Sequence, residues 1–227
     1  NEALGDNFIF YKPKDIIAGD FYWLYQSNSK INLFAVADCT GHGVPGAMVS
    51  VVCSKALDTA VKEYNLINPG QILDKAKQLV LDTFSKTAQN IQDGMDISLC
   101  SIQYNNDDVI VKWAGANNSL WFIQNNIVNE IKANKQPVGL SNNSSSFTTH
   151  NLKLNKGDLL YFITDGFSDQ FGGEKGKKFM SKNLRIVLSN NAHLPMHQQK
   201  ELLEKTFASW KGNMEQVDDV TIIGVRV

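Results

Sequence analysis

Short runs of apolar, β-branched and aromatic residues recur along most of the chain, and turn residues bound each of them. This pattern is typical of β-strands. The polar segments NNDD (105–108) and QNN (124–126) separate consecutive runs and predict hairpin turns, so neighbouring strands are expected to pair antiparallel. The strands that we predict are 8–11, 21–26, 31–37, 97–104, 109–114, 119–124, 127–131, 159–164 and 220–227.

Three other stretches have helical periodicity. After Pro45, apolar residues recur at i, i+4 spacing from Met48 to Val61, and an Asn-Pro pair then begins a second such pattern. The predicted helices are 46–64, 68–88 and roughly 181–209. Strands and helices therefore come in blocks rather than in strict alternation. That order predicts an α+β fold in which helices cover antiparallel sheets, and it disfavours a doubly wound parallel sheet.

The apolar and helical patterns continue on both sides of the most loop-like stretch, SNNSSS (141–146). We therefore interpret residues 1–227 as a single domain. The chain opens on a polar, acidic segment that does not resemble a signal peptide, and we expect no apolar run that approaches the ~20 residues needed to span a bilayer. Because it begins at Asn rather than Met, we expect it to be excised from the C-terminal part of a longer regulatory protein.

Charge and cysteine content narrow the classes of function. The formal net charge is −1 and no basic stripe is visible, which argues against nucleic-acid binding. The three cysteines, Cys39, Cys53 and Cys100, are odd in number and widely spaced, and no C-x-x-C is present. This usage indicates a reducing compartment without a disulfide framework. We expect a cytoplasmic protein, or the cytoplasmic part of a membrane-bound or multidomain sensor.

The stretch ADCTGHGVPGAM (37–48) contains Gly41, Gly43 and Gly46, a literal G-x-G-x-x-G after an apolar strand. A dinucleotide fold needs the first glycine at the strand-to-helix turn and a second parallel strand after the helix. Here Asp38 and two further residues precede Gly41, and the first helix runs directly into another. No Gly-Lys-Ser/Thr follows either, so neither a dinucleotide site nor a P-loop is predicted.

Aspartates recur where predicted strands meet turns: Asp20, Asp38, Asp165, Asp218 and Asp219. Each alone is often a turn former. Carboxylates that a fold gathers repel one another unless a cation lies among them, and carboxylate oxygens suit hard cations such as magnesium or manganese. The set therefore predicts a divalent-metal site, and a pair of such ions can drive an in-line displacement at phosphorus.

Six short motifs in order resemble the PPM-type, metal-dependent Ser/Thr protein phosphatases, in particular the bacterial subgroup typified by the sporulation phosphatase SpoIIE and the general-stress phosphatases. The motifs cover nearly the whole chain: AGDFYW (18–23), ADCTGHGVPGAM (37–48), GMDISLCSI (94–102), WAGANNSL (113–120), ITDGFSDQ (163–170) and DDVTIIGV (218–225).

The resemblance implies a central sandwich of two antiparallel β-sheets flanked by helices on both sides, with two manganese or magnesium ions at one edge. By position, Asp38 would bridge both ions and Cys39 would offer its backbone carbonyl. Asp20 would bind one ion, and Asp165 and Asp218 the other. A metal-bridging hydroxide would then attack the phosphorus of phosphoserine or phosphothreonine directly.

Two assignments carry alternatives. Asp219 fits the final-strand position as well as Asp218 does. The family also has a third, weaker metal site, and Asp93 and Asp96 lie in the corresponding region.

The sequence departs from the family pattern at two points. His42 follows Asp38 by four residues, two more than the histidine that is a candidate general acid in many members, so it is either that acid or a loop histidine. The arginine that grips phosphate in many relatives is absent from FIFYKPKDIIAGD (8–20). Lys12 or Lys14 would substitute for it, or both are simply solvated.

The resemblance also suggests partners. The substrate would be a small regulatory phosphoprotein, such as an anti-sigma-factor antagonist, and a sensor domain would precede this segment. Helices 46–64 and 68–88 match a pair that acts as an activation switch, and they offer a surface for a homodimer, although covering a sheet is a compatible role. No membrane contact by this segment is expected. The alternative function is a catalytically weak or dead phosphoprotein-binding module of the same fold.

Overall fold

Two antiparallel sheets stack face to face in the computed structural model, which describes residues 4–27, 31–85, 93–105, 108–125, 127–142 and 144–227. Every ladder between neighbouring strands in both sheets is antiparallel. The first sheet has the order β1 (Asp6–Lys12), β13 (Val220–Arg226), β10 (Leu159–Ile163), β6 (Leu120–Gln124), β7 (Ile127–Ile131). The second has the order β2 (Phe21–Gln26), β3 (Asn32–Cys39), β4 (Gly94–Asn105), β5 (Asp108–Ala116), β9 (His150–Leu154), and β8 (Val138–Gly139) pairs with β4.

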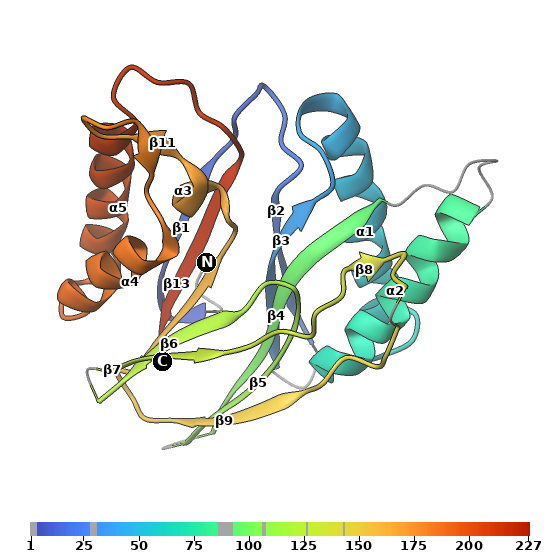
Figure 1. Cartoon of the computed structure of the whole chain (residues 1–227). Coiled ribbons are helices and arrows are strands. Elements are labelled where there is room, and N and C mark those ends of the chain that lie inside the picture. The colour runs from blue at the N-terminus through green and yellow to red at the C-terminus, as the bar shows by residue number, and fades with distance from the viewer. Residues whose placement is uncertain (1–3, 28–30, 86–92, 106–107, 126, 143) are drawn as a thin grey trace.

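Helices cover both outer faces of the sandwich (Figure 1). Those against the second sheet are α1 (Gly43–Lys62) and α2 (Pro69–Ser85), and those against the first are α4 (Ser181–Asn190) and α5 (Met196–Lys211). A short helix, α3 (Gly166–Asp169), follows β10, and a small hairpin joins β11 (Phe171–Gly172) to β12 (Lys177–Lys178). The predicted α+β sandwich is thus confirmed.

Three apolar layers hold this arrangement together. Between the sheets, the rings of Phe34 and Phe162 meet edge to face at 4.7 Å, and Trp113 is fully buried beside them. A second layer lies under α1 and α2, and a third under α4 and α5. The strands β3 and β10, one in each sheet, are buried on both faces, which explains why both read as continuous apolar runs.

The sequence prediction missed several elements. The edge strand β9, HNLKL, turns only Leu152 and Leu154 inward, so polar residues dominate its pattern. The third helical region is two helices, because the chain turns at 191–194 and Pro195 precedes α5. The two-residue strands β8, β11 and β12 and the four-residue helix α3 are too short to show a period. The predicted turns at 105–108 and 124–126, the end of helix 68–88 and the loop 141–146 each include residues outside the described part.

The expectation that no apolar run approaches the length of a membrane span is wrong for one helix. Helix α1 is 20 residues long and, by length and composition alone, apolar enough to cross a membrane. In the fold, one side of it packs on the second sheet through Val49, Cys53 and Leu57. A core helix passes the same test of length and composition, so this property by itself is weak evidence for a span.

Candidate active site

Aspartates gather at one edge of the sandwich, where β3, β4, β10 and β13 begin or end. Asp38 near the end of β3 lies directly opposite Asp96 on β4. Asp165 follows β10, and Asp218 precedes β13. Antiparallel pairing in both sheets brings these ends to the same edge, although the residues are far apart in sequence.

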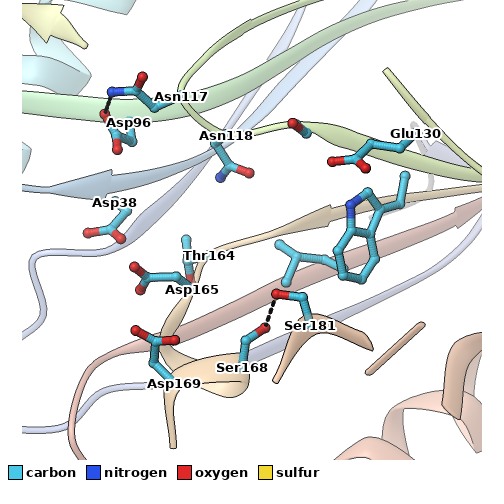
Figure 2. A pocket seen from close by; sticks show the side chains of 13 residues that line it. Asp38, Asp96, Asn117, Asn118, Glu130, Thr164, Asp165, Ser168, Asp169 and Ser181 are labelled. Carbon is cyan, nitrogen blue, oxygen red and sulfur yellow. Dashed lines mark hydrogen bonds between the residues drawn. The ribbon is translucent and has the colours of Figure 1, made fainter. Parts of the chain in front are cut away.

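Two adjoining cavities share Asp38, Asp96 and Asn117 in their walls. We call the first the carboxylate cavity; its wall also includes Asp165 and Asp169, and Figure 2 shows these carboxylates around it. The second, the loop cavity, is lined in addition by Cys39, Thr40, Gly41, His42 and Asp218. The structure therefore brings Asp38, Asp96, Asp165 and Asp218 together, as the sequence predicts.

The carboxylates raise one another's pKa. Burial, followed by the charges of Asp20, Asp165, Asp218 and Asp96, raises the pKa of Asp38 to about 9. Burial, together with its acidic neighbours, raises the pKa of Asp165 to about 6. Carboxyl groups with such pKa values are costly to ionise unless a cation joins them, so the donor set fits hard divalent ions.

Asp20 is buried behind this wall rather than lining it. Its Oδ2 accepts hydrogen bonds from Thr164 Oγ1 at 2.7 Å and from Thr221 Oγ1 at 2.8 Å. Burial raises its pKa to about 7, in spite of these two bonds, and the charges of Asp219 and Asp218 add to the rise. The two threonines fix its orientation beside the cluster.

Asp218 and Asp219, which the sequence leaves as alternatives, have different environments. Asp219 is buried, and its carboxylate accepts backbone N–H groups of Lys14 and Gly19, each at 2.7 Å. Asp218 lines the loop cavity, and its Oδ1 accepts the N–H of Asp219 at 2.9 Å. Asp219 thus anchors the segment before β2, and Asp218 faces the open space.

The glycine-rich loop after Asp38 is compact because backbone atoms approach one another closely. Gly41 has φ +85°, a conformation that L side chains rarely adopt. A Cβ on Gly46 would lie 2.1 Å from the Gly41 carbonyl oxygen, and one on Gly19 would lie 2.4 Å from the same atom. Thr40 N–H donates to the Gly94 carbonyl at 3.0 Å, which holds the residue after Cys39 beside β4. The glycines therefore shape the loop behind Asp38.

His42 lies at the mouth of the loop cavity with its ring held by two charged neighbours. Nδ1 is 3.1 Å from Asp15 Oδ2, and Nε2 is 3.3 Å from Lys14 Nζ. Lys14 is thus placed beside the cavity through His42, whereas Lys12 ends β1. Asp93 precedes β4 with its backbone beside Gly139, and it is not among the residues that line either cavity.

Three residues of the site, Asp15, Asp169 and Asn118, were not predicted from the sequence. Asp15 contacts His42, Asp169 lines the carboxylate cavity and pairs with Lys178 at 2.8 Å, and Asn118 lines the same cavity. Asp169 lies inside the motif ITDGFSDQ and Asn118 inside WAGANNSL, and membership of these motifs was the only sequence signal that could have marked them as site residues.

As they stand, no three His, Cys, Asp or Glu side chains among the described residues converge closely enough to ligate one ion. The carboxylates surround the two cavities instead. A cation would enter from the cavity side, where Asp38 faces both spaces.

Comparisons with known proteins agree with this arrangement. The profile of the Stage II sporulation protein E (SpoIIE) family matches residues 31–227. Phosphoserine phosphatase RsbU of Bacillus subtilis is 26% identical over 162 residues, which are 69% of this chain and 44% of that protein. The chain therefore spans less than half the length of this curated relative.

Two solved structures extend the likeness over almost the whole chain. The SiaA-PP2C domain of Pseudomonas aeruginosa is 31% identical with a TM-score of 0.87, covering 99% of this chain and 87% of that one. The second structure contains the PP2C phosphatase domain and a fragment of the regulatory domain of SpoIIE from Bacillus subtilis. It has a TM-score of 0.73 at 18% identity, and the match covers 98% of this chain and 63% of that one. The second match bears on the fold alone.

Proposed function

Since the chain belongs to the SpoIIE family of PPM-type phosphatases, we propose that it is a metal-dependent protein phosphatase acting on phosphoserine or phosphothreonine. The observation that carries the proposal is the wall of mutually repelling carboxylates around Asp38, at the edge where two cavities meet. Such a wall suits two manganese or magnesium ions.

The residues that would hold these ions are Asp38, Asp165, Asp218 and the backbone carbonyl of Cys39, with Asp20 behind them. When bound, divalent cations lower the pKa of water and neutralise charge on a transferring phosphoryl group. The chain's own contribution is to orient these ligands, as the threonines do for Asp20.

His42 lines the loop cavity, and two neighbours hold its ring there. Its Nδ1 contact with Asp15 orients the ring, and its Nε2 is directed to Lys14. We propose that the imidazole protonates the departing serine or threonine oxygen. A positioned general acid typically contributes about a hundredfold or more in rate.

The substrate that we propose is a regulatory phosphoprotein in a cytoplasmic signalling pathway, of the anti-sigma-factor-antagonist kind. The curated relative named a phosphoserine phosphatase supports the class of substrate. Its greater length is compatible with an additional regulatory segment in the full protein.

The decisive experiment measures hydrolysis of p-nitrophenyl phosphate and of a phosphoserine peptide with and without manganese. We expect turnover to rise at least about a hundredfold with manganese and to vanish when a chelator removes it. Calorimetric titration of the metal accompanies the assay. A folded protein that binds manganese and a phosphoprotein but turns over neither substrate would support the binding-module alternative.

We also propose that α1 contributes to a homodimer. Val44, Met48 and Val51 lie at i, i+4 and i+7 on its outer side and are 62%, 69% and 68% exposed. A contiguous apolar stripe of this kind is a common self-association surface.

Met48→Asp should therefore shift the protein from dimer to monomer in sedimentation at micromolar concentration, because a charge would be buried in the interface. The fold should be retained, since Met48 contacts solvent. Gln78→Asp on the exposed side of α2 is the matched control and should leave the dimer intact. A wild-type protein that is monomeric at all concentrations would refute the dimer.

A further inference from the structure

The carboxylate cavity extends beyond its aspartates, and two cations that border it, Arg185 and Lys178, are already paired with its wall residues Glu130 and Asp169. The described residues that line it include no lysine and no arginine. Its remaining wall consists of Asn117, Asn118, Ser119, Trp121, Glu130, Ile163, Thr164, Ser168 and Ser181. A phosphoryl group that entered here would need hydrogen-bond donors from this wall in addition to cations.

Most polar donors in this wall already have acceptors within the protein. Thr164 Oγ1 donates to Asp20, and Asn117 Nδ2 donates to Asp96 Oδ1 at 2.8 Å. Ser181 Oγ donates to Ser168 Oγ at 3.3 Å. These groups therefore stabilise the wall itself.

Asn118 differs from these residues. Within the described part of the chain its carboxamide has no hydrogen-bond partner, and Figure 2 shows it pointing into the cavity between the aspartates and Glu130. Partly exposed amides are normally solvated, so this group is available to a ligand without breaking an internal bond.

The backbone around Asn118 is fixed on both sides. Asn117 has φ +52°, its N–H donates to the Asn134 carbonyl at 2.8 Å, and its side chain bonds Asp96. Asn118 N–H itself donates to the Ala116 carbonyl. The turn therefore fixes the backbone from which the Asn118 side chain projects, so its amide lies beside the cavity before a ligand arrives.

The neutrality of the amide matters in this cavity. A lysine or arginine inside the wall would form ion pairs with the aspartates, as Lys178 does with Asp169, and would compete with metal ions for them. An uncharged N–H group offers a donor to a phosphate oxygen while the carboxylates remain available to cations.

We propose that Asn118 is a substrate-binding residue whose Nδ2 donates a hydrogen bond to a phosphoryl oxygen of the bound phosphoserine or phosphothreonine. This inference rests on the proposed phosphatase function and adds a phosphate contact to it. The same contact would hold inorganic phosphate, the product, so it is measurable without turnover.

The test compares Asn118→Ala with wild type and with Asn213→Ala, an exposed turn residue after α5. In manganese-loaded protein, calorimetry should show inorganic phosphate binding weakened about tenfold to a hundredfold by Asn118→Ala, since the lost bond reaches a charged oxygen. KM for p-nitrophenyl phosphate should rise by a similar factor, with a smaller change in kcat. Asn213→Ala should match wild type in all three quantities.

Manganese affinity separates a phosphate contact from a role in the metal site. We expect Asn118→Ala to bind manganese within about twofold of wild type. Unchanged phosphate affinity in Asn118→Ala, or a loss of manganese affinity equal to the loss of phosphate affinity, would overturn the proposal, as would wild-type protein that binds manganese but no phosphate. A wild type that binds phosphate through Asn118 without turnover would overturn the phosphatase function and leave the phosphate contact standing.

Discussion

Asp38→Asn should abolish phosphatase activity and, in the same protein without metal, raise the melting temperature. Asp38 lines both cavities, as Asp96 does, and it is the carboxylate that we propose joins both ions, so we expect kcat/KM to fall at least about a thousandfold on its loss. The stability change has the opposite sign because Asp38 is buried among Asp20, Asp165, Asp218 and Asp96. A neutral amide of the same shape removes their mutual repulsion.

The pH dependence of the stability of metal-free protein provides a control for this prediction. The pKa of Asp38 is about 9 in the folded protein and about 4 in the unfolded chain, so the folded state holds its proton more tightly. The corresponding stability is fully present below about pH 4 and is lost as the pH rises toward 9. Asp20 and Asp165 have pKa values of about 7 and about 6, so their contributions to the stability of the fold are lost over the lower part of that pH range.

Metal-free wild type should therefore melt at a lower temperature near pH 8 than near pH 5, and Asp38→Asn should show a smaller difference. At neutral pH the substitution should stabilise by on the order of 2 kcal/mol, or roughly 5 °C in melting temperature. Manganese should stabilise wild type and have little effect on the variant. An Asp38→Asn protein that melts at or below the wild-type temperature throughout this pH range would contradict the repulsion.

The fold was predictable because its main signals are local. Strands such as β2 and β7 were predicted with the bounds they have, since aromatic residues dominate the first and β-branched residues the second. The strand β9 was missed because an edge strand with one buried side needs only two inward apolar residues, and lysine and asparagine fill the rest. Pairing between β10 and β13, which completes the site, joins segments more than 50 residues apart, and no local pattern specifies it.

The site was predictable only in part for a related reason. Asp38 stands out because a buried strand ends at it and three glycines follow. Asp169 and Asn118 have no comparable local mark: what places them in the cavity is a short helix after β10 and a left-handed Asn117 after β5. The roles of adjacent Asp218 and Asp219 depend on where the segment before β2 lies, which the sequence does not reveal.

Asp218 and Asp219 should separate activity from stability when each is replaced by alanine. Asp219→Ala removes the acceptor for the backbone N–H groups of Lys14 and Gly19, each at 2.7 Å, and for that of Asp20 at 3.4 Å, and the bonds to Gly19 and Asp20 are buried. Hydrogen bonds to a carboxylate are worth about 1.5–3 kcal/mol each, so we expect a loss of about 3 kcal/mol or more. For a domain of this size that lowers the melting temperature by about 6–12 °C.

Asp218→Ala should have the reverse profile: it removes the acceptor of a single backbone N–H, that of Asp219, so the melting temperature should fall less than in Asp219→Ala, and manganese-dependent turnover should be lost. Asp219→Asn keeps an amide oxygen that accepts a hydrogen bond, so it should recover part of the stability that Asp219→Ala loses. Thermal melts and calorimetric metal titrations on the three variants decide which of the two aspartates binds the metal. If Asp219→Ala instead keeps its melting temperature and loses the metal, Asp219 is the ligand, and the segment from Lys14 to Asp20 must be held by other contacts.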